Sequence, residues 1–280
     1  MAQTLGIIAG GGFFPITVAQ SARAVGMRVV GVGFTSDTDP SFPKHCDTFC
    51  WLKLGQLSKL IAFFHKHGAE QVAMAGPINK PRALDIRPDW RAAKLLFSLS
   101  TKGDDAILRA LLRELEREGF VVVSAQSFVP DLAAPAGILT HRAPSTQEYA
   151  DIVLGWKITQ ALGSFDVGQC VILREGIVLA IEALEGTDAA IARAGSLGGS
   201  GAVVVKRPKP GQEHRVDLPA VGLQTIERMR HAGATCLAIE AGHCLFFDRS
   251  KATDLANSYG IAVVSQNEFV LTEENSVSSV

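Results

Sequence analysis

Short apolar runs alternate with helix-like stretches along the whole chain, and this alternation constrains the fold more than any other feature. In the first half, apolar runs at 5–9, 27–34, 71–76 and 120–125 are separated by amphipathic stretches such as 55–70 and 104–119. This β-α-β order implies right-handed crossovers and a mostly parallel sheet. Because ligands on such sheets bind beyond the carboxyl ends of the strands, the loops after residues 9 and 75 are expected to lie at a site.

The first of these loops is a glycine run, "AGGGFFP", between an apolar run and a helix-like stretch. Such a turn lets backbone N–H groups approach an anion at the positive end of a helix dipole. The fingerprint G-x-G-x-x-G fails, because it needs a glycine at Pro15, and the next apolar run ends at Phe34 without an acidic residue for a ribose. A phosphate or nucleotide seat and a purely structural turn both remain open, and a nicotinamide cofactor is disfavoured.

The second half alternates as well, after the Pro- and Ala-rich stretch "VPDLAAPAG", which is typical of a linker. Helices are expected at 146–162, 187–195, 218–233 and 250–259, and Arg174-Glu175-Gly176 predicts a hairpin inside 169–183. The prediction is an α/β protein with a Rossmann-like parallel-sheet domain (1–130), a linker (131–137) and an α/β catalytic domain with a mixed sheet (138–280). The tail after about residue 272 is expected to be disordered.

Composition excludes several classes of function. The 280 residues carry a net charge of −1 and no basic stripe, which argues against nucleic-acid binding. No apolar run approaches the roughly 18 residues of a spanning helix, and no secretory signal is evident, so a cytoplasmic protein is expected. "HCDTFC" (45–50) has the composition of a metal site, but no second Cys/His pair follows, which favours reduced, buried thiols over zinc.

Polar residues follow two of the apolar runs in the second half. "EALEGTDAAI" places Glu185, Gly186, Thr187 and Asp188 between a strand and a helix. Either Thr187 is the N-cap with Asp188 in the first turn, or the hydroxyl and nearby amides face a phosphate. Glu240 ends the strand in "AIEAGHC", where such a residue is more often structural than catalytic.

The stretch "VVVKRPKPGQEHRVDLP" (203–219) concentrates charge in an almost neutral chain. It contains Lys206, Arg207, Lys209, Glu213, Arg215 and Asp217. Cations close to carboxylates suit an anionic substrate with a divalent metal. Asp217 is equally well placed to cap a helix that begins at Leu218 or Pro219, so both readings stay open.

Six motifs in this order resemble the UDP-2,3-diacylglucosamine pyrophosphatases of lipid A biosynthesis, of the LpxI type. They are "GIIAGGGFFP", "AGPINKPR", "KGDDAIL", "EALEGTDAAIARAG", "VVVKRPKPGQEHRVDLPAVG" and "LAIEAGHCLFFDR", and they span nearly the full chain. Two local departures occur: Gln212-Glu213-His214 stands where the family pattern has an acid-rich "QD", and the family often has no histidine at the position of His243.

The resemblance implies hydrolysis of UDP-2,3-diacylglucosamine to UMP and 2,3-diacylglucosamine 1-phosphate in a Gram-negative bacterium. It implies Mg²⁺ or Mn²⁺, and it makes Asp217 the catalytic residue and a candidate metal ligand. The lipid-linked sugar nucleotide would bring transient contact with the inner membrane surface, whereas monomer or homodimer stays open. The residues expected to bind the substrate are Gly11, Gly12, Phe13, Gly76, Asn79, Thr140, Glu185, Gly186, Thr187, Asp188, Lys206, Gln212, Arg215 and Glu240.

Two rival functions remain at this point. An NAD(P)-dependent oxidoreductase is suggested only by the N-terminal strand–glycine–helix unit. A non-catalytic sensor of lipid or nucleotide would bind the same substrate without turning it over.

Overall fold

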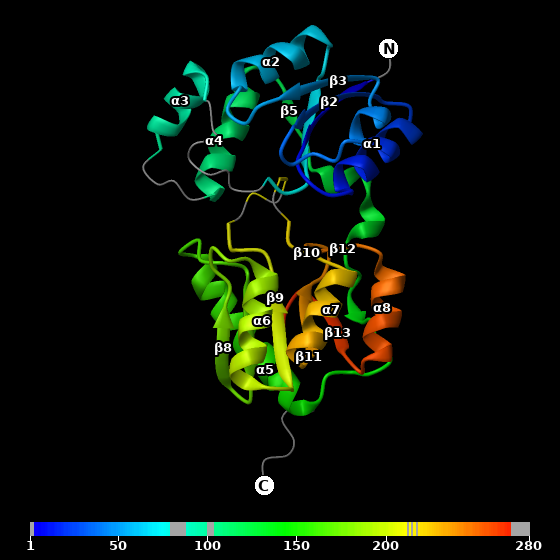
Figure 1. Ribbon diagram of the computed structural model, residues 1–280, viewed down its shortest axis with the longest axis vertical. Helices are drawn as coiled ribbons and strands as arrows, with labels where there is room; N and C mark the ends of the chain where they lie inside the picture. The colour runs from blue at the N-terminus through cyan, green and yellow to red at the C-terminus, as the bar shows by residue number, and fades with distance from the viewer. Residues whose placement is uncertain are drawn as a thin grey trace. The chain divides into compact units, whose positions relative to one another are not determined.

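The computed structural model describes residues 3–78, 88–99, 104–211, 213, 215, 216 and 218–269. The chain divides into two compact units (Figure 1). Unit 1 comprises Met1–Pro130 together with Glu213–Asp217, and unit 2 comprises Asp131–Gln212 and Leu218–Val280. Unit 1 is therefore built from two separate stretches of the chain.

The described residues of unit 1 form a five-stranded parallel sheet in the order β3-β2-β1-β4-β5. Its strands are β1 (Thr4–Ala9), β2 (Arg28–Phe34), β3 (Thr48–Leu52), β4 (Gln71–Ala75) and β5 (Val121–Val122). Every residue of β1 is buried, as expected for a central strand of a parallel sheet. This is the Rossmann strand order, in which the direction of winding changes between β1 and β4, and it confirms the predicted fold.

Helices cover this sheet. They are α1 (Phe14–Ala24), α2 (Leu57–Lys66), α3 (Trp90–Phe97) and α4 (Asp104–Arg117), with the 3-10 turns η1 (Phe42–His45) and η2 (Ala125–Phe128). The apolar faces of α2, α3 and α4 pack with the sheet in one core that contains Val32, Phe64 and Leu115. Strand β3 and helix α3 have no counterpart among the predicted elements.

Unit 2 contains a six-stranded mixed sheet in the order β6-β13-β11-β9-β7-β8. Its strands are β6 (Gly137–Ile138), β7 (Cys170–Arg174), β8 (Ile177–Ile181), β9 (Ala202–Lys206), β11 (Ala234–Glu240) and β13 (Ala262–Gln266). The predicted hairpin is confirmed: Glu175 and Gly176 join β7 to β8 with φ of 50° and 77°. The Asp151 carboxylate accepts both turn amides, at 2.8 and 2.7 Å, and thereby holds the turn.

The faces of this sheet are covered by different helices. Helix α5 (Thr146–Gly163) packs on one face, where its Trp156 lies against Val205 and Phe269. Helices α6 (Thr187–Gly198), α7 (Leu223–Ala232) and α8 (Arg249–Ser258) pack with the opposite face and lie in a row (Figure 1). Among the described residues, no helix has the length and apolar character that a bilayer crossing would require.

One predicted helix begins later than expected. Instead of starting near Leu218, α7 starts at Leu223 with Gly222 as its N-cap. The preceding residues form β10 (Ala220–Val221), which pairs in parallel with β12 (Leu245–Phe246). The pairing satisfies backbone groups that a helix would otherwise use: Leu245 N–H donates to the Pro219 carbonyl and Phe247 N–H to Val221. Asp217 is therefore not the cap of this helix.

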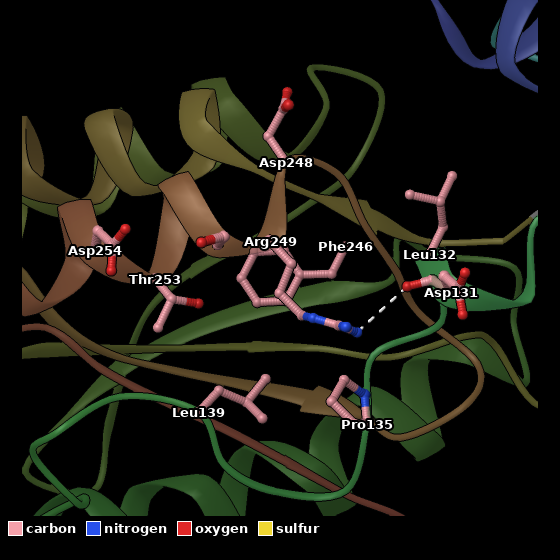
Figure 2. A pocket seen from close by; sticks show the side chains of 10 residues that line it. Asp131, Leu132, Pro135, Leu139, Phe246, Asp248, Arg249, Thr253 and Asp254 are labelled. Atoms are coloured by element: carbon pink, nitrogen blue, oxygen red, sulfur yellow. Dashed lines mark hydrogen bonds between the residues drawn. The ribbon is translucent and has the colours of Figure 1, made fainter.

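The stretch that joins the units along the chain is hydrogen-bonded to unit 2. After η3 (Pro130–Leu132), Ala133 forms an antiparallel bridge with Leu245. Ala134 donates to the Cys244 carbonyl and accepts from Gly242. The Arg249 guanidinium donates to the carbonyls of Asp131 and Ala133 and stands at the edge of an open pocket of about 590 Å³ (Figure 2). These contacts order the stretch despite its linker-like composition.

A partly buried ion pair fixes the start of α5 in unit 2. Arg142 donates to both carboxylate oxygens of Glu148, at 2.6 and 2.9 Å. Glu148 also accepts from Ser145 N–H and from the Thr235 hydroxyl, so it joins the α5 N-terminus to β11. Burial alone would raise the pKa of the Glu148 carboxyl, but these donors outweigh it and hold that pKa below its ordinary value.

Replacing Glu148 with glutamine should reduce the free energy of unfolding by about 2 kcal/mol at neutral pH, because Arg142 loses its charged partner. The folded-state pKa is depressed, so the carboxylate stabilises the fold above about pH 4.5, and this contribution is lost as the pH falls through the folded pKa. Urea titrations should therefore show the wild-type advantage shrinking below pH 4.5. A difference that stays constant with pH would contradict this account.

Candidate functional site

In unit 1, the glycine turn after β1 lies beside the loop after β4, where the strand order reverses. Gly10 N–H donates to the Ala75 carbonyl at 2.8 Å, and Gly11 N–H donates to Pro77 at 2.7 Å. A Cβ atom on Gly10 would overlap the carbonyl oxygens of Gly76 and Pro77. The two loops that the sequence places at one sheet edge are thus in direct backbone contact.

Because of this contact, one part of the glycine run fits a structural turn and the other part fits an anion-binding site. The amides of Gly10 and Gly11 are used inside the fold, so these two glycines are structural. Within the described residues, the amides of Gly12 and Phe13 donate to no backbone carbonyl, and Phe13 is the N-cap of α1. An anion at the N-terminus of α1 would meet these two amides. The Phe13 side chain beside them is 74% exposed.

The charged segment of residues 213–216 belongs to unit 1. Arg215 holds Glu213 through two hydrogen bonds of 2.8 and 2.9 Å and Glu116 of α4 through one of 2.7 Å. Val216 packs against the unit 1 core. The hydrogen bonds from Arg215 lower the pKa of Glu213, and the two carboxylates raise the pKa of Arg215. Arg215, expected to bind substrate, is balanced by carboxylates of the protein in this structure.

In unit 2, four strands end at one edge of the mixed sheet. Strands β9, β11 and β13 run parallel, and β8 runs parallel to β9 because both are antiparallel to β7. Lys206 and Glu240, the last residues of β9 and β11, therefore lie at the same edge of the sheet. Lys206 is only 6% exposed and donates to the Ala220 carbonyl at 2.9 Å. The structure thus brings together two of the predicted substrate-binding residues.

A second cation lies beside Glu240. Arg207 approaches its carboxylate to 3.0 Å while its guanidinium lies 4.4 Å from the centre of the Trp156 ring. His243 Nδ1 is 3.4 Å from the other oxygen of Glu240. Because a desolvated carboxylate needs a counter-charge, Arg207 explains how Glu240 can lie in this half-buried position.

The same edge holds the buried polar atoms that the fold leaves unsatisfied. Among the described residues these are Gln169 Oε1, Arg207 Nε and Ser265 Oγ, which have no hydrogen-bond partner; Glu240 Oε2 also lacks a hydrogen bond but faces Arg207 at 3.0 Å. Gln169 precedes β7, and the others lie at the ends of β9, β11 and β13. Unsatisfied buried polar atoms are costly and call for a bound group or water. Their position at one edge makes this edge the strongest candidate for a ligand site in unit 2.

The loop before α6 differs from its prediction in one respect. Gly186, with φ of 81°, is the N-cap of α6, and no side chain caps the helix. Thr187 is not the cap; its hydroxyl instead donates to Glu182 at 3.0 Å. The turn needs a residue with positive φ, which glycine adopts without strain. The N-cap is therefore Gly186, one residue before Thr187. Asp188 is in the first turn, as predicted.

Other predicted residues of this region are committed to the fold or lie elsewhere. Glu185 accepts from Arg193 at 2.6 Å, and Asp188 lies 3.6 Å from Arg228. Thr140 lies at the opposite end of the sheet, where its hydroxyl accepts from Val263 N–H near the start of β13. The structure therefore does not bring Thr140 to Lys206 and Glu240. Asp217, Gln212, Asn79 and the tail after residue 272 lie outside the described residues.

No described group of three or more His, Cys, Asp or Glu side chains is arranged to hold a metal ion. Glu213 in unit 1 and Glu240 in unit 2 each already face an arginine. The five cysteines are free. Burial raises the pKa of Cys46 and of Cys244 to about 12 and raises those of Cys170 and Cys236 further, which keeps these thiols protonated.

Some site residues have no clear sequence signal. Glu116 lies 99 positions before its partner Arg215, inside an ordinary charged helix. Trp156 looks like a core residue of α5 and becomes notable only because Arg207 lies over its ring. Ser265 does carry a signal, since a hydroxyl at the end of a buried strand points to the ligand edge of the sheet.

Comparison with known proteins covers both halves of the chain. Residues 4–132 match the family model of the LpxI N-terminal domain, and residues 135–264 match that of the LpxI C-terminal domain. The chain is 35% identical over 273 residues to UDP-2,3-diacylglucosamine pyrophosphatase LpxI of Caulobacter vibrioides, covering 94% of this chain and 97% of that protein.

Solved structures show only weak likeness. A pyruvate carboxylase from Rhizobium etli aligns with a TM-score of 0.30 and 13% identity, over 52% of this chain and 14% of that one. A biotin carboxylase complex from Campylobacter jejuni aligns with a TM-score of 0.30 and 9% identity, over 70% and 42% of the two chains. Likeness at this level supports no conclusion about function.

The glycine turn gives a direct test of its packing. Gly10→Ala should destabilise the protein by about 3 kcal/mol, because the methyl group meets backbone that cannot yield. Gly12→Ala is the matched control: nothing described lies within 4 Å of its Cβ position, so only the strain of φ at 76° remains, about 1 kcal/mol. Chemical denaturation of both variants measures the difference, and equal costs would refute the close contact.

Proposed function

The chain belongs to the LpxI family, and from this premise we propose that it hydrolyses the diphosphate of UDP-2,3-diacylglucosamine to UMP and 2,3-diacylglucosamine 1-phosphate in lipid A biosynthesis. The observation that carries the proposal is the 35% identity to the Caulobacter vibrioides pyrophosphatase over 94% of the chain. Both family domains are present, so the similarity is not confined to a shared nucleotide-binding fold. The same breadth disfavours an NAD(P)-dependent oxidoreductase.

The chemistry needs charge neutralisation, a positioned water and exclusion of competing solvent. Water adds across one P–O bond of the diphosphate, and the bridging oxygen leaves with one of the two phosphates. In the proposal, Lys206 balances phosphate charge in unit 2, since its described hydrogen bond goes to a neutral carbonyl and not to a carboxylate. The amides of Gly12 and Phe13 offer a second anion seat at the α1 N-terminus.

Asp217 is proposed as the catalytic residue that orients or deprotonates the attacking water. Two observations support this assignment. The alternative role as a helix cap is excluded, because α7 begins at Leu223 under Gly222. In addition, its neighbour Arg215 is tied to Glu213 and Glu116, which fixes the backbone beside this position to unit 1.

A requirement for Mg²⁺ or Mn²⁺ is proposed from the family resemblance alone. The described residues do not fit a metal centre, because no cluster of three potential ligands is present among them and because Glu213 and Glu240 already face arginines. No step above is therefore assigned to a metal.

The test is release of UMP from UDP-2,3-diacylglucosamine by purified protein. Asp217→Asn should lower kcat by at least about 10³-fold while the substrate dissociation constant changes little, because only transition-state stabilisation is removed. Asp254→Asn, at an exposed position on α8, is the matched control and should keep full activity. EDTA should abolish release, and added Mg²⁺ or Mn²⁺ should restore it. Tight binding without UMP under any metal would instead identify a sensor.

Removing the ammonium of Lys206 tests the unit 2 site. Lys206→Met keeps the apolar stem in its buried position but loses the positive charge, so kcat/KM should fall by about 10²-fold with little change in the unfolding midpoint. Lys251→Met, at an exposed position on α8, is the control for loss of one positive charge. Unchanged kcat/KM in the Lys206 variant would remove this residue from the site.

A further inference from the structure

Helix α3 carries two large aromatic side chains on the face opposite the unit 1 core. Trp90 and Phe97 are both 87% exposed. They are seven residues apart, two helical turns, so they lie on the same side of the helix. Lys94, which is also exposed, lies between them at i+4 from Trp90. We call Trp90, Lys94 and Phe97 the α3 outer stripe.

The opposite face of α3 is firmly attached to unit 1. Ala92 is buried and Leu95 packs against the core shared with α2 and α4. Asp89 caps the helix by accepting from Ala92 N–H and also accepts from Ser58 N–H of α2. Arg91 donates to Glu114 of α4 at 2.6 Å. Core packing and capping therefore explain the inner face and the orientation of α3, but they leave the outer stripe without a role.

An outer stripe of this kind is unusual for a surface helix. The solvent face of a helix that packs on a core is normally polar, and Trp and Phe expose more apolar area than other residues. A short helix that presents Trp and Phe with an interspersed lysine has the composition of helices that lie in the interface of a bilayer. The aromatic rings would enter the headgroup region while the lysine meets phosphate groups.

Charge distribution favours the same partner. Residues 1–130 contain 15 Lys and Arg against 11 Asp and Glu, a net +4, whereas residues 131–280 contain 12 against 17, a net −5. The outer stripe thus lies on the basic half of the chain, which an anionic lipid surface attracts. Exposed apolar residues of the acidic half, such as Phe165 and Leu197, lack this complementarity.

We propose that the α3 outer stripe docks unit 1 on an anionic lipid bilayer. The inference rests on the proposed function in one respect: a substrate with two acyl chains resides in a membrane, so an enzyme that takes it gains from residence at the surface. Docking itself needs neither substrate nor turnover. It can therefore be measured independently of UMP release, and the two proposals can fail separately.

The experiment is flotation of the full-length protein with vesicles of phosphatidylethanolamine and phosphatidylglycerol, compared with vesicles of phosphatidylcholine, without substrate. Wild-type protein should float with the anionic vesicles, and Trp90→Ser/Phe97→Ser should reduce the partition coefficient about tenfold. Lys94→Glu should weaken binding to anionic vesicles only, and raised salt should narrow that difference. The matched control, Phe165→Ser/Leu197→Ser, removes comparable exposed apolar side chains from unit 2 and should float like the wild type.

Unfolding midpoints of all variants establish that each is folded, which is expected because the replaced side chains are exposed. Equal flotation of the wild type and Trp90→Ser/Phe97→Ser would overturn the proposal. So would a wild-type dimer that the double variant converts to a monomer, which would make the stripe a contact between copies of the chain. A loss of activity on detergent-dispersed substrate without any loss of vesicle binding would also overturn it, and would assign the stripe to the acyl chains.

Discussion

Parallel strands that are buried on both faces have little room for polar side chains except at their ends, and the rest of the structure depends on this constraint. Strand β1 has no exposed residue, and β9 is buried along its full length up to Lys206. Polar side chains on these strands would have to be desolvated beneath helices. The buried charged side chains Lys206, Arg207 and Glu240 accordingly lie where β9 and β11 end.

Burial at those ends has an electrostatic consequence. Charged groups in each unit already have partners of opposite sign: Arg207 faces Glu240 in unit 2, and Arg215 faces Glu213 and Glu116 in unit 1. Such pairs hold their side chains in fixed positions, so little reorganisation is needed when a charged ligand arrives. Lys206 differs because its described partner is the neutral carbonyl of Ala220.

The sequence predicts the frame of this arrangement well. Hydrophobic periodicity predicts most strands of both sheets but misses the edge strands β3 and β6, and the turn residues Glu175 and Gly176 reveal the hairpin between β7 and β8. The family resemblance is confirmed by both domain models. Long-range pairing is what sequence cannot show: Glu116 and Arg215 meet across 99 positions, and β10 forms only because β12 lies beside it. Thr140 illustrates the same limit, since the antiparallel strand β6 delivers it to the opposite end of the sheet from Lys206.

The discontinuous make-up of unit 1 also has a consequence for how the protein is made. A ribosome releases the chain from the N-terminus, so residues 1–130 emerge long before Glu213–Asp217. Val216 can join the unit 1 core only after β7, β8 and β9 of the other unit have been synthesised. Unit 1, which leaves the ribosome first, is thus completed late, by the segment Glu213–Asp217 that follows Asp131–Gln212 of unit 2 in the chain. The core of unit 1 can therefore form during translation before Val216 is there to cover it.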